Sequence, residues 1–308
     1  MRAGIISTIQ ESMRKNKNIY FLAGDLGYSV LEEMQNEFPE RVINIGVAEQ
    51  NMTGIAAGLA LSGNKVYVYS IIPFVTMRCF EQIRNDICFH NLDVTILGAG
   101  AGLMYGILSA THFALEDVSI MRSLINMTVF CPADEAEAVL GMKYLQRSKH
   151  PAYVRVGKRT EPIIYEKSFP FTFGKAHVIK KGPDIVIFSA GPLLYNVLLV
   201  DRELEKKNIH ATIVDMHTIK PLDEAAVRKL SKGKKMVFTV EEHSKFGGLG
   251  SAVAEVIAAE KNAPPLGIIA ADEKYPKRIG GHEYLRNEYG LSVEKIVLKI
   301  TTSLKKNS

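Results

Sequence analysis

Short apolar runs rich in β-branched residues alternate with helix-length amphipathic segments along most of the chain. The runs predict strands, and the segments between them, where apolar residues recur every three or four positions, predict helices. Strands separated by helices are typical of βαβ units and parallel sheets. The predicted strands are 19–22, 66–71, 94–97, 127–130, 152–156, 185–189, 211–214, 235–240 and 266–270, and the clearest predicted helices are 52–61, 135–146, 192–206 and 251–259.

The polar stretch 157–173 interrupts this alternation. It contains Pro162 and Pro170 and shows no clear periodicity. We therefore expect an α/β protein of two domains, each a mostly parallel sheet flanked by helices. The expected boundaries are residues 1–160 for the first domain, 161–173 for a linker and 174–308 for the second domain.

The composition is that of an ordinary globular protein and argues against two classes of partner, nucleic acids and membranes. The 308 residues are 47% hydrophobic and 23% charged, and the net charge of +5 comes from scattered Lys and Arg. Because a nucleic-acid surface needs clustered basic residues beside aromatic ones, we expect no nucleic-acid partner. No apolar run reaches the ~18 residues of a membrane span, and the N-terminal segment is amphipathic rather than signal-like. We expect a cytoplasmic protein that does not contact a membrane.

Cysteine usage argues against metal–thiolate chemistry. The three cysteines, Cys79, Cys88 and Cys131, form no Cys-x-x-Cys pair. An iron–sulfur cluster ligated by cysteines of this chain is therefore excluded, and a zinc–thiolate site is disfavoured. We expect no metal ligands in this chain.

An acidic residue lies on an apolar helix face in the segment 46–61. Met52, Ile55, Ala56 and Leu59 recur at helical spacing and predict a buried face, and Glu49 precedes Met52 by three residues. A carboxylate directed at an apolar interior is costly unless it has a partner or is protonated. Taken alone, the pattern favours an acid that complements the helix dipole or forms a buried ion pair.

Six motifs follow one another in order between Phe38 and Ser251. They are Phe38-Pro39-Glu40-Arg41 with 44–52, Arg78-Cys79-Phe80-Glu81-Gln82-Ile83-Arg84, 111–117 with Met121-Arg122, Cys131-Pro132-Ala133-Asp134, Thr218-Ile219-Lys220-Pro221-Leu222-Asp223, and Val240-Glu241-Glu242-His243 with 247–251. In this order they resemble the transketolase family. The first domain looks like the pyrimidine-binding domain of transketolases and deoxyxylulose-phosphate synthase, and is similar to the β subunits of 2-oxo acid dehydrogenases.

The resemblance implies that Glu49 is the catalytic glutamate of a thiamine-diphosphate enzyme. In the family this carboxylate hydrogen-bonds N1′ of the aminopyrimidine ring and favours the imino tautomer, whose nitrogen removes the thiazolium C2 proton. Such proton transfer needs a carboxylate in a dry site with a tunable pKa. The cofactor supplies the carbanion stabilisation, and the protein supplies position and electrostatics.

Other positions that match the family's site are expected to contact cofactor or substrate. The resemblance implies Phe74 as the aromatic ring stacked on the pyrimidine, with Phe80 as the alternative, and Asp25 near the cofactor pocket, although a turn-capping role explains Asp25 equally well. His112 is expected to face the substrate and exchange hydrogen bonds or protons with its hydroxyls.

Basic residues that follow the last strand of the first domain match the family's phosphate contacts. Arg155 and Lys158 fall near the positions where relatives bind a substrate phosphate. Lys158 replaces an arginine and lacks its bidentate geometry.

Two departures put ordinary pentose-phosphate substrates in doubt. Leu108 lies near the place of an aspartate that reads a sugar hydroxyl in transketolases, and Gly100 lies where they have a phosphate-contacting histidine. A different or more apolar carbonyl substrate is therefore an open alternative.

A further departure implies a second polypeptide. Full-length relatives carry an earlier domain with Gly-Asp-Gly and a following asparagine, which hold Mg²⁺ and the diphosphate; Gly24-Asp25-Leu26-Gly27 does not match that motif. We expect an N-terminal transketolase subunit to provide this site, with thiamine diphosphate shared across the interface of an α₂β₂ heterotetramer whose core is a homodimer. Gly54 and Gly58 on one helical stripe would let another backbone approach closely, and packing within the chain explains this stripe equally simply.

Three functions are compatible with the sequence. The favoured one is the C-terminal subunit of a split transketolase that transfers a two-carbon ketol unit between sugars. The alternatives are the β subunit of a 2-oxo acid dehydrogenase or a deoxyxylulose-phosphate-synthase-like enzyme, and a non-catalytic scaffold or regulatory subunit.

Two glycine-rich segments resemble ligand-binding loops. Residues 98–102 lack the third glycine of a dinucleotide motif, and we interpret them as a flexible active-site loop. Residues 247–250 could bind an anion at a helix N-terminus, but we interpret them as packing in the second domain.

Overall fold

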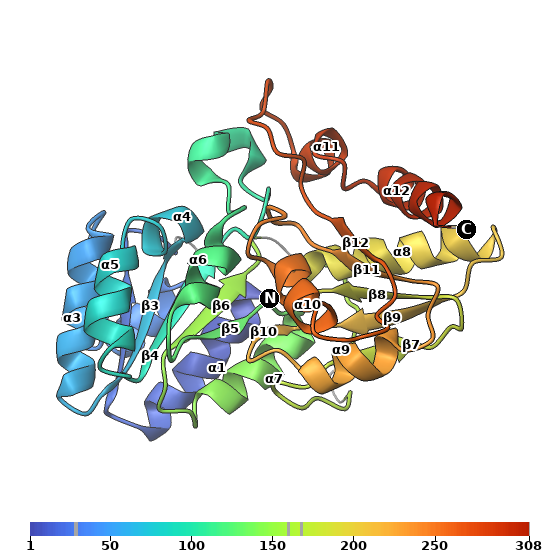
Figure 1. The fold of residues 1–308 in the computed structure, drawn as a ribbon. Helices are drawn as coiled ribbons and strands as arrows, with labels where there is room; N and C mark the ends of the chain where they lie inside the picture. Colours follow the sequence, from blue (N-terminus) through green and yellow to red (C-terminus); the bar gives the residue numbers. More distant parts are fainter. Residues whose placement is uncertain (28–29, 159–160, 167–168, 308) are drawn as a thin grey trace.

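Two sheets make up the centre of the computed structural model, which describes residues 1–27, 30–158, 161–166 and 169–307 (Figure 1). The first is a seven-stranded sheet in the order β10-β5-β6-β4-β3-β1-β2, and the second is a five-stranded sheet in the order β12-β11-β8-β9-β7. Neighbouring strands are parallel except for the β10–β5 and β7–β9 pairs. The expected fold class, two domains with mostly parallel sheets, is confirmed.

The first sheet is built largely from the first half of the chain and has helices on both faces. Its strands are β1 (Ile19–Ala23), β2 (Val42–Asn44), β3 (Lys65–Ile71), β4 (Val94–Ala99), β5 (Thr128–Phe130), β6 (Ala152–Val156) and β10 (Thr218–Lys220). The α-helices are α1 (Arg2–Lys15), α2 (Glu32–Glu37), α3 (Glu49–Leu61), α4 (Ile72–Val75), α5 (Phe80–Gln82), α6 (Asp117–Ser123) and α7 (Glu135–Leu145). A π-helical turn, η1 (Ile83–Cys88), and two 3₁₀ turns, η2 (Gly106–Leu108) and η3 (Ala110–His112), complete this part.

The second sheet is built from the second half of the chain. Its strands are β7 (His177–Lys180), β8 (Ile185–Ser189), β9 (Ala211–Asp215), β11 (Met236–Val240) and β12 (Leu266–Ile269). Its helices are α8 (Leu194–Glu205), α9 (Glu224–Ser231), α10 (Leu249–Ile257), α11 (His282–Glu288) and α12 (Val293–Lys306), with a 3₁₀ turn, η4 (Gly191–Leu193), before α8.

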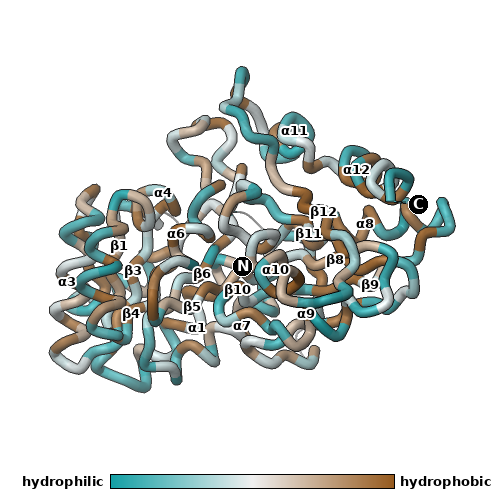
Figure 2. The backbone as a smooth tube through the Cα atoms, viewed as in Figure 1, coloured by the Kyte–Doolittle hydropathy of each residue, from teal (hydrophilic) through white to brown (hydrophobic). Residues whose placement is uncertain are grey.

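The central strands are apolar along most of their length, as strands covered on both faces should be. Every residue of β4, β6, β8, β9 and β11 is buried. Figure 2 shows hydrophobic residues along the strands of both sheets. The sequence missed β2, β7 and β10, which are three or four residues long. β10 also leaves its own half of the chain to pair antiparallel with β5, so that the second half of the chain completes the first sheet.

Helix α3 buries a different stripe from the one expected. Glu49, Met52, Thr53, Ala56 and Ala57 are buried, whereas Ile55 is 36% exposed and Leu59 is half-buried. The prediction for Ile55 was wrong because the stripe that faces the sheet runs through residues 49, 52, 53, 56 and 57, which leaves position 55 on the opposite side. None of the helices in the described parts of the chain is long and apolar enough to span a bilayer.

Candidate active site

Glu49 is buried at the first turn of α3 and has two side-chain partners. Only 1% of the residue is exposed. Ser70, near the end of β3, donates its hydroxyl to Oε1 at 2.9 Å, and Arg78 donates from Nη1 to Oε2 at 2.8 Å. Gly24, which follows β1, provides room: a Cβ there would lie 3.2 Å from Cγ of Glu49 and 3.1 Å from Oγ of Ser70. The carboxyl ends of two neighbouring strands thus form the walls around this carboxylate.

Arg78 joins Glu49 to an aromatic ring. It lies in the turn between α4 and α5, four residues after Phe74. The guanidinium carbon of Arg78 lies 4.6 Å from the centroid of the Phe74 ring, within the range of a cation–π contact. The same guanidinium therefore contacts both the Glu49 carboxylate and the Phe74 face.

His112 contacts the other side of this cluster. Its ring centroid lies 5.1 Å from that of Phe74 in an edge-to-face arrangement and 6.0 Å from that of Tyr105. Burial lowers the pKa of His112, and the positive charge of Lys158 lowers it further. The imidazole is therefore held in its neutral form near pH 7, able to accept a proton.

Lys158 extends the cluster along the Tyr105 ring. The Lys158 ammonium lies 4.0 Å from the centroid of that ring. The structure thus brings together four residues that the sequence proposed for one site: Glu49, Phe74, His112 and Lys158. Arg78 and Tyr105 provide the contacts between them.

Asp25 and Phe80 have other partners than this cluster. Asp25 is exposed, with a φ of +52°, and its carboxylate accepts the Asn44 side-chain amide at 3.1 Å. Oδ1 of the Asn44 side chain accepts the backbone N–H groups of Asp25 and Gly46, which orders the loop that leads to Glu49. Phe80 is half-buried and packs against a hydrophobic core cluster, so of these two candidates Phe74 is the one whose ring contacts His112.

Arg155 has partners inside the protein instead of a face toward a substrate. It is 5% exposed. Its Nε and Nη2 donate to the Asp117 carboxylate at 2.8 and 3.1 Å, and Nη2 also donates to the carbonyls of Ala114 and Glu242. Tyr153 donates its hydroxyl to the same Asp117 at 2.6 Å. These bonds connect β6 to the start of α6 and to the second domain, and we leave Arg155 out of the candidate site.

Hydrogen bonds hold the segment around Gly100, which we interpreted from the sequence as a flexible active-site loop. Gly100 and Ala101 are buried and donate their N–H groups to the Val156 carbonyl, so the residues that follow β4 are bonded to the end of β6. Gly100 has a φ of +90°, and a Cβ there would lie 2.1 Å from Cδ2 of Tyr105. The Tyr105 ring therefore fills the space that a side chain at position 100 would need. Further along the loop, Ile107 and Leu108 are 56% and 42% exposed.

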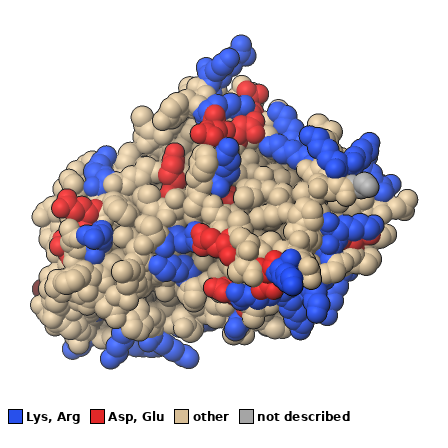
Figure 3. All heavy atoms as spheres, in the orientation of Figure 1, with Lys and Arg blue, Asp and Glu red and all other residues tan. Residues whose placement is uncertain are grey.

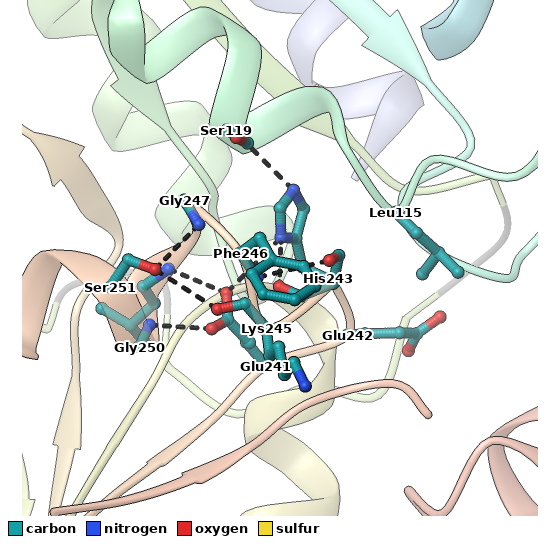
Figure 4. Close-up of polar contacts among 12 residues, drawn as sticks. Leu115, Ser119, Glu241, Glu242, His243, Lys245, Phe246, Gly247, Gly250 and Ser251 are labelled. Carbon is teal, nitrogen blue, oxygen red and sulfur yellow. Dashed lines mark hydrogen bonds and ion pairs between the residues drawn. The ribbon is translucent and has the colours of Figure 1, made fainter. Parts of the chain in front are cut away.

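The glycine-rich segment 247–250 contains the N-terminus of α10, and this N-terminus binds a carboxylate of the protein itself. The buried Glu241 carboxylate accepts the N–H groups of Leu249 and Gly250 at the start of α10, at 2.8 and 2.7 Å (Figure 4). Nearby, Nε2 of His243 accepts the Ser119 N–H of the first domain at 3.4 Å. Because this terminus already binds a carboxylate, the segment has the packing role that we expected rather than a ligand site.

Sequence reasoning assigned no role to Arg78, Ser70 or Tyr105. Arg78 belongs to one of the six family motifs, and its spacing of four residues from Phe74, about one helical turn, was the available signal. Ser70 offered no signal, because its hydroxyl reaches Glu49 only through the pairing of distant strands. In the described part of the chain, no group of three or more His, Cys, Asp and Glu side chains is placed to hold a metal ion.

Comparison with known proteins matches two regions of the chain to family descriptions. Residues 1–162 match the description "Transketolase, pyrimidine binding domain", and residues 174–296 match "Transketolase, C-terminal domain". The chain is 36% identical over 297 residues to a subunit of the apulose-4-phosphate transketolase of Phocaeicola vulgatus, covering 96% of this chain and 94% of that protein. It is 33% identical to a 6-deoxy-6-sulfo-D-fructose transketolase subunit of a Clostridium species, covering 96% and 92%.

A solved structure shares the whole fold. It is described as a split gene transketolase, inactive β4 tetramer, and superposes with a TM-score of 0.88 at 33% identity, covering 100% of this chain and 99% of that one. Together with the two family regions, this similarity over the full length shows that the chain belongs to the transketolase family.

Proposed function

We propose that this chain is the C-terminal subunit of a split transketolase and transfers a two-carbon ketol unit between sugar-type substrates. The observation that carries the proposal is the buried Glu49 carboxylate. It pairs with the partly exposed Arg78 guanidinium, which lies over the Phe74 ring. A carboxylate with these neighbours fits the aminopyrimidine of thiamine diphosphate, which needs an acceptor at one edge and a stacking surface at one face. When bound, thiamine diphosphate would supply the carbanion-stabilising chemistry.

The residues of this chain have distinct tasks in that reaction. Glu49 would accept a hydrogen bond from the pyrimidine edge, and Phe74 would pack against its face. His112, neutral because of burial and the nearby Lys158, would accept a proton from a substrate hydroxyl. The Lys158 ammonium would attract an anionic group of the substrate as a point charge.

We further propose that a second polypeptide binds the diphosphate and its Mg²⁺. The motif that binds them in full-length relatives is absent from the sequence, and the described residues contain no carboxylate–histidine cluster of the kind a metal needs. An N-terminal subunit that carries this site would place the cofactor between the two proteins. The similarity to a structure described as a split gene transketolase supports this division.

An exposed face of α3 supports association with a second copy. Gly54 and Gly58 are exposed, and a Cβ on either would contact nothing in this chain. Val47, Ile55 and Leu61 are 70%, 36% and 64% exposed on or beside this helix. Figure 3 shows mostly uncharged surface over this end of the molecule, whereas Lys and Arg gather over the second domain. Small residues among apolar ones allow two helices to approach closely, as in a homodimer core.

Reconstitution tests the proposal. The chain is co-purified with its N-terminal partner, thiamine diphosphate and Mg²⁺, and ketose donors, phosphorylated and not, are screened for ketol transfer to aldose acceptors. Activity of the pair, and none for either subunit alone, is the expected result. Acylation of a lipoyl domain without ketol transfer would instead establish a 2-oxo acid dehydrogenase, and a pair that does not bind the cofactor would leave the scaffold interpretation.

A further inference from the structure

Arg78 makes two contacts that a bound aminopyrimidine ring would also make. Its guanidinium donates to Oε2 of Glu49 at 2.8 Å and lies 4.6 Å from the Phe74 ring centroid. A guanidinium is planar and cationic, donates hydrogen bonds in its plane and stacks on aromatic faces. A protonated aminopyrimidine has the same features: a planar ring with N–H donors at its edge. The two groups therefore compete for one carboxylate and one aromatic face.

On the basis of the proposed function, we propose that Arg78 is a positioning residue that takes the place of the pyrimidine ring in the cofactor-free chain and is displaced when the cofactor binds. Before binding, Arg78 gives the buried carboxylate a counter-charge and directs Oε2 toward the pocket. After displacement, Glu49 keeps its bond from Ser70 and presents Oε2 to the incoming ring.

The environment of Arg78 permits this movement. Its side chain is 43% exposed, against 1% for Glu49. The residue lies in the turn between α4 and α5, and its guanidinium is held by Glu49 and Phe74. The guanidinium can therefore move into solvent without opening the core, while the carboxylate remains fixed by α3 and β3.

We expect Arg78 to reduce the affinity for the cofactor only modestly. A half-exposed ion pair contributes little to stability, because solvent screens it. A ligand that requires the minor, open state binds with an affinity reduced by the fraction of that state. Removing the competing side chain should therefore tighten cofactor binding by roughly three- to tenfold.

Binding of thiamine diphosphate and Mg²⁺ to the reconstituted pair tests this inference. Wild type, Arg78→Met, Arg78→Lys and the control Arg84→Met are compared by calorimetry and stopped-flow circular dichroism. Arg84 is exposed in η1, and its guanidinium donates to the adjacent Asn85. We expect faster association and a lower Kd for Arg78→Met, an intermediate change for Arg78→Lys, which keeps the charge without the planar group, and no change for the control.

Two outcomes contradict different claims. Weaker or slower binding by both Arg78 variants, with an unchanged control, would overturn the displacement and make Arg78 a ligand of the bound cofactor. A wild-type pair that does not bind thiamine diphosphate would overturn the proposed function itself, and this inference with it. Melting curves of the variants separate either result from a loss of folding, and Arg78→Lys keeps a counter-charge on Glu49 should Arg78→Met be unstable.

Discussion

The Glu242 carboxylate accepts the backbone N–H of Leu103 at 2.7 Å, which joins the second domain to the loop that leads to His112. The same carboxylate accepts Nε of Arg286 and Nε2 of His282, both at 2.6 Å and both on α11. The Arg286 guanidinium and the His282 imidazole hold the pKa of Glu242 well below its usual range despite burial. Loop position and second-domain packing therefore depend on one buried charge.

Replacing Glu242 with Gln should destabilise the protein and loosen the loop. The amide would leave the buried Arg286 without its counter-charge, a change that costs about 3 kcal/mol or more. Urea denaturation measures the loss, and hydrogen exchange at the Leu103 amide measures the loosening. The matched control is Glu283→Gln, because Glu283 also pairs with Arg286 but is 71% exposed; its effect should stay below about 1 kcal/mol. Equal effects of the two variants would contradict a special role for Glu242.

Stability should fall as the pH rises from about 4 to about 7. Asp215 and Glu137 are buried together with Tyr165 and Asp134 nearby, and burial raises the pKa of Asp215 to about 7 and that of Glu137 well above its usual value. An acid whose pKa is higher in the folded state stabilises the fold while protonated. That contribution is complete below the unfolded pKa, near 4, and is lost as the pH rises through the folded pKa.

Asp215→Asn tests this assignment. The amide can still accept the Tyr165 hydroxyl, which now bonds Oδ2 at 2.7 Å, and it places no negative charge beside the Glu137 carboxyl. The variant should therefore gain stability relative to wild type above pH 7 and lose part of the pH dependence. Melting temperatures between pH 5 and 9 provide the measurement. A parallel pH dependence in both proteins would show that this pair does not titrate in the range.

The sequence was sufficient for the architecture because periodicity reports burial directly. Strands such as 152–156 and 185–189 were predicted with the observed bounds, since continuous apolar runs identify strands covered on both faces. β10 was missed because its three residues gain their partner from the other half of the chain. Short strands of this kind carry no periodic signal of their own.

Only those site residues that belong to recognisable family motifs could be predicted from the sequence. Glu49, Phe74, His112 and Lys158 were identified from family resemblance, and the structure places them in one cluster. Arg155 illustrates the limit: its position in the sequence suggested a phosphate contact, but its Nε and Nη2 donate to Asp117 and to two backbone carbonyls. Whether a charged side chain faces a ligand or a buried partner depends on tertiary contacts that spacing along the chain does not reveal.

Gly100→Ala should disturb the loop through Tyr105. The positive φ of +90° is unfavourable for alanine, at a cost of about 1–3 kcal/mol, and the added Cβ would collide with the Tyr105 ring. We expect lower thermal stability and loss of the Tyr105–Lys158 contact, measured by melting curves and by the pH titration of His112 in NMR. The double variant Gly100→Ala/Tyr105→Ala should recover the part of the stability loss that comes from the collision. No recovery would show that backbone strain alone explains the defect.

Gly58→Leu should disrupt self-association without harming the fold. The side chain would contact nothing within the chain, and replacing glycine inside a helix stabilises that helix by up to about 1 kcal/mol. At a close helix–helix contact, however, leucine would separate the two copies. Sedimentation velocity should show smaller assemblies for this variant at an unchanged or raised melting temperature. Thr302→Leu on the exposed side of α12 is the control, and an unchanged assembly for both variants would place the interface elsewhere.

Glu49→Gln should abolish turnover while the protein remains folded. The amide can still accept the Ser70 hydroxyl, which holds the side chain in place, but it no longer supplies a carboxylate for proton transfer. Loss of a general acid–base group lowers rates by about 10²- to 10⁴-fold, so kcat/KM of the reconstituted pair should fall by at least that factor, with a melting temperature close to that of wild type. Glu81→Gln, an exposed residue of α5, serves as the control and should retain full activity. If Glu49→Gln keeps more than about a tenth of the activity, then burial of this carboxylate against Ser70 and Arg78 serves folding alone, and the reaction must depend on a different group.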